Sequence, residues 1–173
     1  LHAGANEFGR LAQGVKKRKK GTDTINFIAH TAVPEGRTVT YARFCANVRP
    51  QKEETKRCCI TVGGDRIDYP GKVSTKTSGL TTIKLLLNGV VSKPDGKFMT
   101  ADVKNFYLNT PLERPEYMRI PIKLIPQEII DDYNLTELVH NDYVYVEINK
   151  GMYGLPQAGL LANKLLARRL AKY

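Results

Sequence analysis

The sequence predicts an α+β fold in which strands and helices share a hydrophobic core. With 173 residues and 42% hydrophobic side chains, the chain is long and apolar enough to bury such a core. Short segments rich in β-branched and aromatic residues predict strands, and other segments with apolar residues every three or four positions predict helices. No internal repeat or low-complexity tract is present. We therefore expect one domain, or two small lobes around a common core.

The N-terminal third predicts a helix, a basic loop and a hairpin. Residues 3–14 place Phe8 and Leu11 at a spacing that predicts a short helix with both side chains inward. The run VKKRKKG, residues 15–21, has five consecutive basic side chains, so a mobile surface loop is favoured over a localisation signal or a phosphate contact. The segments TINFIAH and RTVTYARF flank VPEG, which is typical of a turn, and together they predict an antiparallel hairpin.

The middle of the chain predicts a strand, a helix and a second strand. KRCCITVGGD, residues 56–65, predicts a strand that ends in a bend at its glycine pair. LTTIKLLLNGVV, residues 80–91, predicts a helix. Its buried stripe is expected to consist of Leu80, Ile83, Leu87 and Val90. After a turn at KPDGK, FMTADV, residues 98–103, predicts a strand that enters the core.

The C-terminal third predicts a polar connection followed by a strand and a helix. Residues 111–143 contain four prolines and one helical segment, QEIIDDY, so we expect a connecting lobe. YVYVEI, residues 143–148, alternates apolar and polar side chains, which is typical of a half-buried strand. KGMYGLPQAG then predicts a turn, and LLANKLLARRLAKY predicts a helix with a basic outer face.

The charge favours a polyanionic partner, because 27 Lys and Arg against 17 Asp and Glu give a net charge of +10. Ribosomal and membrane-surface proteins share such a charge, so nucleic acid is one of several partners. The three cysteines, Cys45, Cys58 and Cys59, lack metal-ligand spacing and predict neither a zinc site nor a disulfide framework. No apolar run approaches the roughly 20 residues that span a bilayer, and no signal-peptide core is present, which predicts a soluble intracellular protein.

Asp102 is the residue that points most directly to chemistry. It lies at the end of a predicted apolar strand, where a carboxylate must meet a cation or bear a large desolvation cost. A metal ion would satisfy it, although an isolated aspartate at a strand end is more often a helix cap or turn former. Asp102 opens the octapeptide DVKNFYLN, and MYGLPQAG precedes a helix about 50 residues later. The two motifs form a pattern, which favours the metal interpretation.

These motifs, in their order and wording, resemble the reverse transcriptases of copia-type retrotransposons. The likeness covers IDYPG, LTTIKLLL, DVKNFYLNTPLERPEYMRIP and VYVEINKGMYGLPQAG, and thus nearly the whole chain. It implies a right-hand polymerase, of which this chain would be the fingers and the N-terminal part of the palm, truncated before the Tyr-x-Asp-Asp hairpin. The absence of an initial methionine and the helical pattern that runs to Tyr173 agree with an expected fragment of a Pol polyprotein.

The resemblance implies boundaries and partners. Residues 1–21 would be a lead-in with the basic loop, and residues 22–173 a partial reverse transcriptase domain. The fingers would comprise about 22–79 and 112–150, and the palm about 80–111 and 151–173. Implied partners are an RNA or DNA template with primer, deoxynucleoside triphosphates and the rest of the polyprotein, without a membrane. Implied locations are a cytoplasmic virus-like particle and the nucleus.

The resemblance also assigns roles to individual residues. Asp102 would be a metal-binding catalytic aspartate, and the carbonyl of Val103 would complete the shell of the second of two Mg²⁺ ions, which jointly promote phosphoryl transfer. Tyr107 would exclude the 2′-hydroxyl of a ribonucleotide, or simply pack in the core. Gln157 would contact the incoming nucleotide, or be a polar residue that starts a helix. Gly154 and Gly159 would leave room beside substrate and template, or serve turn geometry.

One position departs from the family pattern. Two basic residues separated by one spacer usually hold the triphosphate on the strand before the glycine bend. Arg57 matches the first, but Cys59 occupies the second and cannot make the bidentate phosphate contact of arginine. Lys56 compensates only in part. Two alternatives to a working polymerase segment therefore remain: a non-catalytic nucleic-acid-binding module, and a degenerate retrotransposon remnant without present function.

Overall fold

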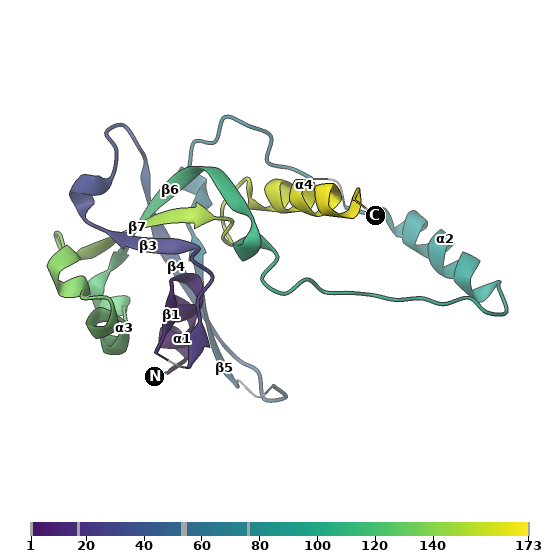
Figure 1. Cartoon of the computed structure of the whole chain (residues 1–173), viewed down its shortest axis with the longest axis horizontal. Helices are drawn as coiled ribbons and strands as arrows, with labels where there is room; N and C mark the ends of the chain where they lie inside the picture. Colours follow the sequence, from purple (N-terminus) through teal and green to yellow (C-terminus); the bar gives the residue numbers. More distant parts are fainter. Residues whose placement is uncertain (1, 17, 53–54, 76, 173) are drawn as a thin grey trace.

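A computed structural model describes residues 2–16, 18–52, 55–75 and 77–172. These residues form an α+β fold with four α-helices, a mixed five-stranded sheet curled into a half-barrel, and a separate two-stranded hairpin (Figure 1). The α+β expectation is confirmed at this level. Five short 3₁₀ helices connect the elements: η1 (His30–Ala32), η2 (Gly64–Arg66), η3 (Tyr107–Asn109), η4 (Ile122–Leu124) and η5 (Leu135–Leu138).

The large sheet has the strand order β3-β7-β6-β4-β5. Its strands are β3 (Ile25–Ile28), β4 (Val39–Val48), β5 (Lys56–Val62), β6 (Pro111–Pro121) and β7 (Tyr143–Lys150). Every neighbouring pair is antiparallel except β4 and β6, which run parallel. The predicted hairpin between TINFIAH and RTVTYARF is wrong, because β3 pairs with β7 and β4 pairs with β5 and β6. The turn at VPEG exists, with Arg37 N–H donating to Pro34 O, but the strands on either side of it diverge.

Strand β6 lies at the centre of the sheet, whereas the sequence predicted a polar connection there. Its C-terminal half, from Glu116 to Pro121, pairs with β7, and the side chains of Met118 and Ile120 are fully buried. The register shifts between Pro111 and Glu116, so the prolines of this segment fall at an irregularity of the ladder. Proline cannot donate to a ladder and is tolerated in a strand at such irregularities and at strand ends. The prolines therefore mark a bulged strand instead of a loop.

Strand β7 follows the predicted alternation. Val144, Val146 and Ile148 are fully buried and face the core, while the side chains between them are half-buried. The core also takes Ile25 from β3 and Ile60 from β5. The KRCCITVGGD strand and the bend after it are likewise confirmed as β5 and η2.

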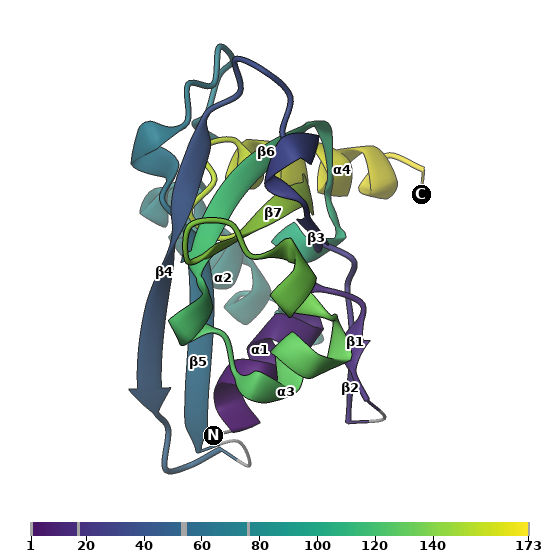
Figure 2. The same cartoon turned by 90° about the vertical axis from the view of Figure 1, so that its left-hand side faces the viewer.

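Helix α1 (His2–Leu11) packs against β5 and against the small hairpin of β1 (Gly14–Val15) and β2 (Lys19–Lys20), as Figure 2 shows. Phe8 and Leu11 are each 1% exposed, so the predicted inward face is confirmed. The basic run was expected to be a mobile loop, but its described residues form the β1–β2 hairpin; Lys17 lies outside them. The hairpin forms because Val15 is buried beneath α1 and anchors the charged segment.

Two further helices follow in the C-terminal half. Helix α3 (Gln127–Asp132) begins after Pro126, as predicted, and buries Ile129. Helix α4 (Ala158–Leu170) follows the MYGLPQ turn, also as predicted, and buries Ala158 and Ala162 at its start. Basic residues occupy its last turn.

Helix α2 (Leu80–Val91) projects away from the sheet on two long connections (Figure 1). The helix is confirmed, but its predicted buried stripe is wrong, since none of its residues is buried. The predicted strand FMTADV is also wrong: residues 97–103 have no regular structure, and Met99 is 83% exposed. A strand needs a neighbour for its backbone hydrogen bonds, and no described strand lies beside this segment.

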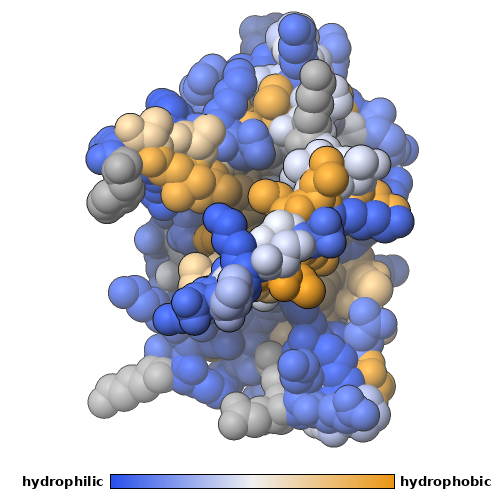
Figure 3. Space-filling view, turned by 90° about the vertical axis from the view of Figure 1, so that its right-hand side faces the viewer, coloured by the Kyte–Doolittle hydropathy of each residue, from blue (hydrophilic) through white to orange (hydrophobic). Residues whose placement is uncertain are grey.

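Seen from the α2 side, the surface carries patches of hydrophobic side chains (Figure 3). Large apolar residues of α2 contribute to this exposed surface: Leu80, Ile83, Leu85, Leu86, Leu87 and Val91. None of the helices in the described part of the chain has both the length and the apolar character needed to cross a bilayer.

Candidate functional site

Tyr107 lies in a tight turn between the exposed segment 97–103 and β6. Its ring packs edge-on against Tyr153, with centroids 5.0 Å apart, and lies 5.7 Å from the ring of Phe106. Its backbone carbonyl closes the 3₁₀ turn by accepting a hydrogen bond from Thr110 N–H. A Cβ on Gly159 would lie 4.0 Å from the Tyr107 hydroxyl. The two motifs DVKNFYLN and MYGLPQAG, far apart in the sequence, are thus in contact.

The MYGLPQ turn is held against the end of β5. Val62 N–H donates to Tyr153 O at 2.8 Å, and Gly154 has φ of +98°. A Cβ at Gly154 would lie 2.0 Å from Val62 O, so only glycine fits there. The resemblance placed Gly154 where a substrate or template strand would approach closely. In the structure, the group that approaches Gly154 is the backbone of Val62.

Gln157 is 1% exposed and is oriented by a buried carboxylate. Its Nε2 donates to Glu116 Oε1 at 3.3 Å, and Glu116 also accepts from Arg37 and Arg114, at 3.2 and 3.3 Å. Because the amide nitrogen is directed at Glu116, the amide oxygen points elsewhere, and Oε1 is buried without a hydrogen-bond partner among the described residues. A buried acceptor left unpaired costs roughly 1–3 kcal/mol. A ligand with an N–H or O–H donor would relieve that cost.

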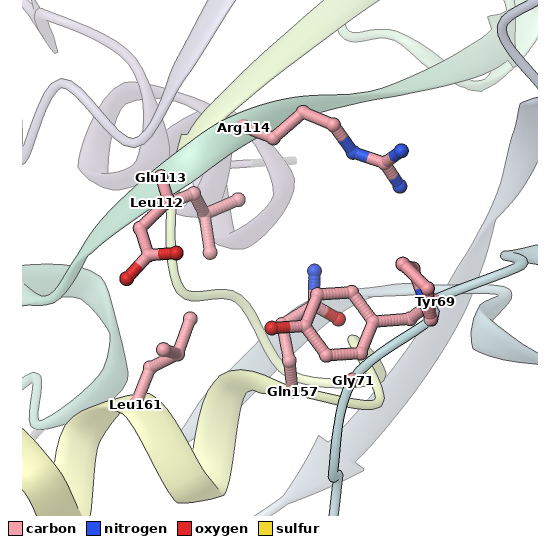
Figure 4. Close-up of a pocket in the computed structure, with 8 residues that line it drawn as sticks. Tyr69, Gly71, Leu112, Glu113, Arg114, Gln157 and Leu161 are labelled. Atoms are coloured by element: carbon pink, nitrogen blue, oxygen red, sulfur yellow. The ribbon is translucent and has the colours of Figure 1, made fainter.

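Gln157 lines a cavity of about 310 Å³ between β6, the start of α4 and the IDYPG segment. Figure 4 shows Leu112 and Leu161 facing one another across it, with Tyr69 beside Gln157 and Arg114 extending along the strand above. Apolar walls with a few polar groups are typical of small-molecule sites. The cavity therefore combines an apolar surface with the charged side chains of Glu113 and Arg114, and it is bordered by Gln157, whose amide oxygen is buried and unpaired among the described residues.

Arg57 lies toward the other end of β5, in a separate hollow of about 130 Å³. Arg10 and Asn105 line the same hollow, and Arg10 Nη1 donates to Asn105 Oδ1 at 3.3 Å. The neighbouring thiol of Cys58 is half-buried there, and burial, aided by the Glu7 carboxylate, raises its pKa. Arg57 is therefore near the DVKN turn, and Gln157 lines a separate cavity.

Asp102 and Val103 are both exposed, and neither belongs to a strand or helix. In the described part of the structure no ion pair or hydrogen bond engages the Asp102 carboxylate. No three His, Cys, Asp or Glu residues come together there in a way that could hold a metal ion. One exposed carboxylate does not fit a site for two Mg²⁺ ions, which clustered carboxylates hold.

The structure thus brings Tyr107, Gly159 and the Gln157 turn together and places Arg57 beside Asn105, three residues beyond Asp102. Sequence reasoning missed Glu116, which fixes the orientation of Gln157, and Tyr69 and Arg114, which complete the cavity. Glu116 could have been suspected, because it is an acidic residue between Pro115 and the apolar half of a strand, where a buried carboxylate needs cationic partners.

Comparison with known proteins finds no match to this chain among protein-family models, curated proteins or solved structures.

Proposed function

We propose that this chain forms the fingers and the first part of the palm of an RNA-directed DNA polymerase similar to those of copia-type retrotransposons. In this proposal Tyr107 and Gln157 contact the incoming deoxynucleotide, and Arg57 contributes to holding its phosphates. Asp102 supplies one carboxylate of a metal site whose other carboxylates lie outside these 173 residues. The chain by itself is not proposed to polymerise.

The observation that carries the proposal is the position of the turn at residues 104–109. It touches the MYGLPQ turn through Tyr107 and Tyr153, and it borders the Arg57 hollow through Asn105. These are the three blocks that the resemblance assigns to one nucleotide site. They are separated by about 50 residues each in the sequence.

The unpaired Oε1 of Gln157 gives independent support, because a nucleotide carries donors that could satisfy it. The apolar and exposed α2, followed by the exposed Asp102, is consistent with a palm whose remaining strands come from another segment. Those strands would cover α2 and give residues 98–103 the ladder partner that they lack.

The test is primer extension by a longer polypeptide that carries this chain and the residues following it in its gene. The proposal expects divalent-cation-dependent extension that falls by at least about a thousandfold in Asp102→Asn, since a lost metal ligand removes much of the catalytic stabilisation. Tyr107→Ala should raise the ratio of ribonucleotide to deoxynucleotide incorporation, and Tyr107→Phe, which keeps the ring, should not. Extension that survives Asp102→Asn would end the catalytic assignment.

A non-catalytic nucleic-acid-binding role is the second proposal, favoured by the net charge of +10 and by the basic surface beside α1. It predicts that the longer polypeptide binds nucleic acid with a strong salt dependence but extends no primer. The two functions are therefore separated by the same pair of measurements, extension and binding, made on one preparation.

A further inference from the structure

A second hollow, larger than the one at Arg57, lies between the β1–β2 hairpin and the turn at 104–109. It has a volume of about 600 Å³ and is open to solvent. Three separate segments line it: the end of α1, residues 18–23 and residues 104–109. Of its ten lining residues among those described, five are cationic and only Asp23 is acidic. The hollow is therefore a local concentration of positive charge.

Two of the five cations are already neutralised. Arg10 forms an ion pair with the buried Glu7 at 2.5 Å, and Arg18 pairs with Glu128 at 2.7 Å. In the described part of the structure, no ion pair or hydrogen bond engages the side chains of Lys19, Lys20 or Lys104. Three unpaired ammonium groups therefore remain against one carboxylate, and the hollow keeps a net positive charge.

The floor of the hollow is preorganised. Arg10 O accepts hydrogen bonds from Thr22 N–H and Thr22 Oγ1, at 2.9 and 2.8 Å, which joins the segment after β2 to α1. On the other side, Arg10 Nη1 donates to Asn105. The lysines thus project from segments that are fixed to one another, so a ligand would spend little free energy in bringing them together.

We propose that this hollow binds the phosphate backbone of a nucleic-acid strand, with Lys19, Lys20 and Lys104 contacting successive phosphates. Lysine contacts phosphate as a point charge and carries no base specificity, so binding should not depend on sequence. No aromatic side chain is among the described residues that line the hollow, which gives a base nothing to stack on. A free nucleotide should therefore bind weakly here, whereas the affinity for a strand increases with each phosphate that contacts a lysine.

This inference rests on the second proposed function and gives it a site. It uses neither Asp102 nor the cavity at Gln157, although Arg10, Lys19 and Asn105 also line the hollow at Arg57. The test uses the 173-residue chain and a fluorescent single-stranded oligothymidylate of roughly 12 nucleotides, within the range of known single-strand sites. Fluorescence anisotropy gives the dissociation constant between about 50 and 200 mM salt. The triple variant Lys19→Ala, Lys20→Ala, Lys104→Ala should weaken binding at least about tenfold at low salt and reduce the slope of log K against log salt by about 2.

The matched control is Lys72→Ala, Lys93→Ala, Lys97→Ala, which removes the same charge from exposed residues outside the hollow. It should change the affinity less than about threefold. Equal losses in the two triple variants would overturn the proposal, because affinity would then follow net charge alone. Lys104 lies outside the hairpin, so the single variant Lys104→Ala tests the site even if the triple variant unfolds. Weaker binding by Lys104→Ala, with an unchanged circular dichroism spectrum, would support the site.

Competition separates the sources of phosphate. Unlabelled oligonucleotide should displace the probe, while deoxythymidine triphosphate, inorganic phosphate and an acidic peptide at equal phosphate or carboxylate concentration should not. Displacement by the triphosphate at the same concentration would make the hollow a nucleotide site and overturn the strand assignment. Displacement by the acidic peptide would make it a general polyanion site, which would overturn that assignment as well.

Discussion

Helix α2 presents several large apolar side chains that the fold leaves uncovered, and their effect on self-association can be estimated. Leu85 and Leu86 are 67% and 65% exposed. Burying a leucine fully contributes about 1.5–3 kcal/mol, so each side chain leaves roughly 1–2 kcal/mol of burial unrealised. Leu85→Glu with Leu86→Glu should therefore weaken association through α2 by about 2–4 kcal/mol, which is roughly 30- to 700-fold in a dissociation constant.

Sedimentation velocity over a concentration series measures the change. We expect the unaltered chain to form larger species as its concentration rises, and the double variant to shift toward the monomer. The control is Thr81→Glu with Thr82→Glu, which adds the same charge to exposed positions of the same helix without removing apolar surface. It should leave the association nearly unchanged.

Neither variant should alter the unfolding of the core, because no residue of α2 is buried. The free energy of unfolding, from urea titration, should stay within about 0.5 kcal/mol of the unaltered chain. A monomeric chain at every concentration tested, or equal effects of the two variants, would show that α2 is not the cause of association. A large loss of core stability would show that α2 packs on the fold in solution.

Two further predictions concern single positions. Gly154→Ala should destabilise the fold by about 3 kcal/mol or more, because the new Cβ would meet the backbone of Val62 and the residue has a positive φ. Gly36→Ala, also at a positive φ but in open space, should cost only about 1 kcal/mol. Equal losses of unfolding free energy in urea titration would refute the contact at Gly154. At pH 8, iodoacetamide should modify the exposed Cys45 before Cys58, because the raised pKa of Cys58 leaves less of its thiol as thiolate. The rate of modification of Cys58 should rise as the pH is raised further. Peptide mass spectrometry follows both sites, and finding Cys58 modified first would refute the prediction.

Local patterns predicted individual elements well where the pattern and the burial agree. The alternation of Val144, Val146 and Ile148 predicted β7 because one face of that strand meets the core. Strand β6 was missed because its prolines and charges suggested a loop, and only the neighbouring β7 and β4 turn that segment into a strand. Pairing between distant segments cannot be read from local composition, which is also why the β3–β4 hairpin was predicted wrongly.

The opposite error occurred at α2. Leu80, Ile83 and Leu87 have the spacing of a buried stripe, yet the described chain offers them nothing to pack against. Periodicity indicates which face of a helix is apolar, but burial needs a partner surface. For the candidate site, no local pattern predicts the contact between Tyr107 and the MYGLPQ turn. The position of Glu116 beside an apolar stretch suggests a buried carboxylate, but its three donors, Arg37, Arg114 and Gln157, come from distant segments and cannot be read from that pattern.

The hydrogen bond from Val62 to Tyr153, with the glycine contact beside it, has a mechanical consequence. The β4–β5 pair extends from this junction as far as Val48 and Lys56, and β5 is held along the way by α1, whose Glu7 accepts a hydrogen bond from Ile60 N–H. A substitution that opens this junction should therefore loosen two regions together, the α1 side of the sheet and the turn that carries Gln157.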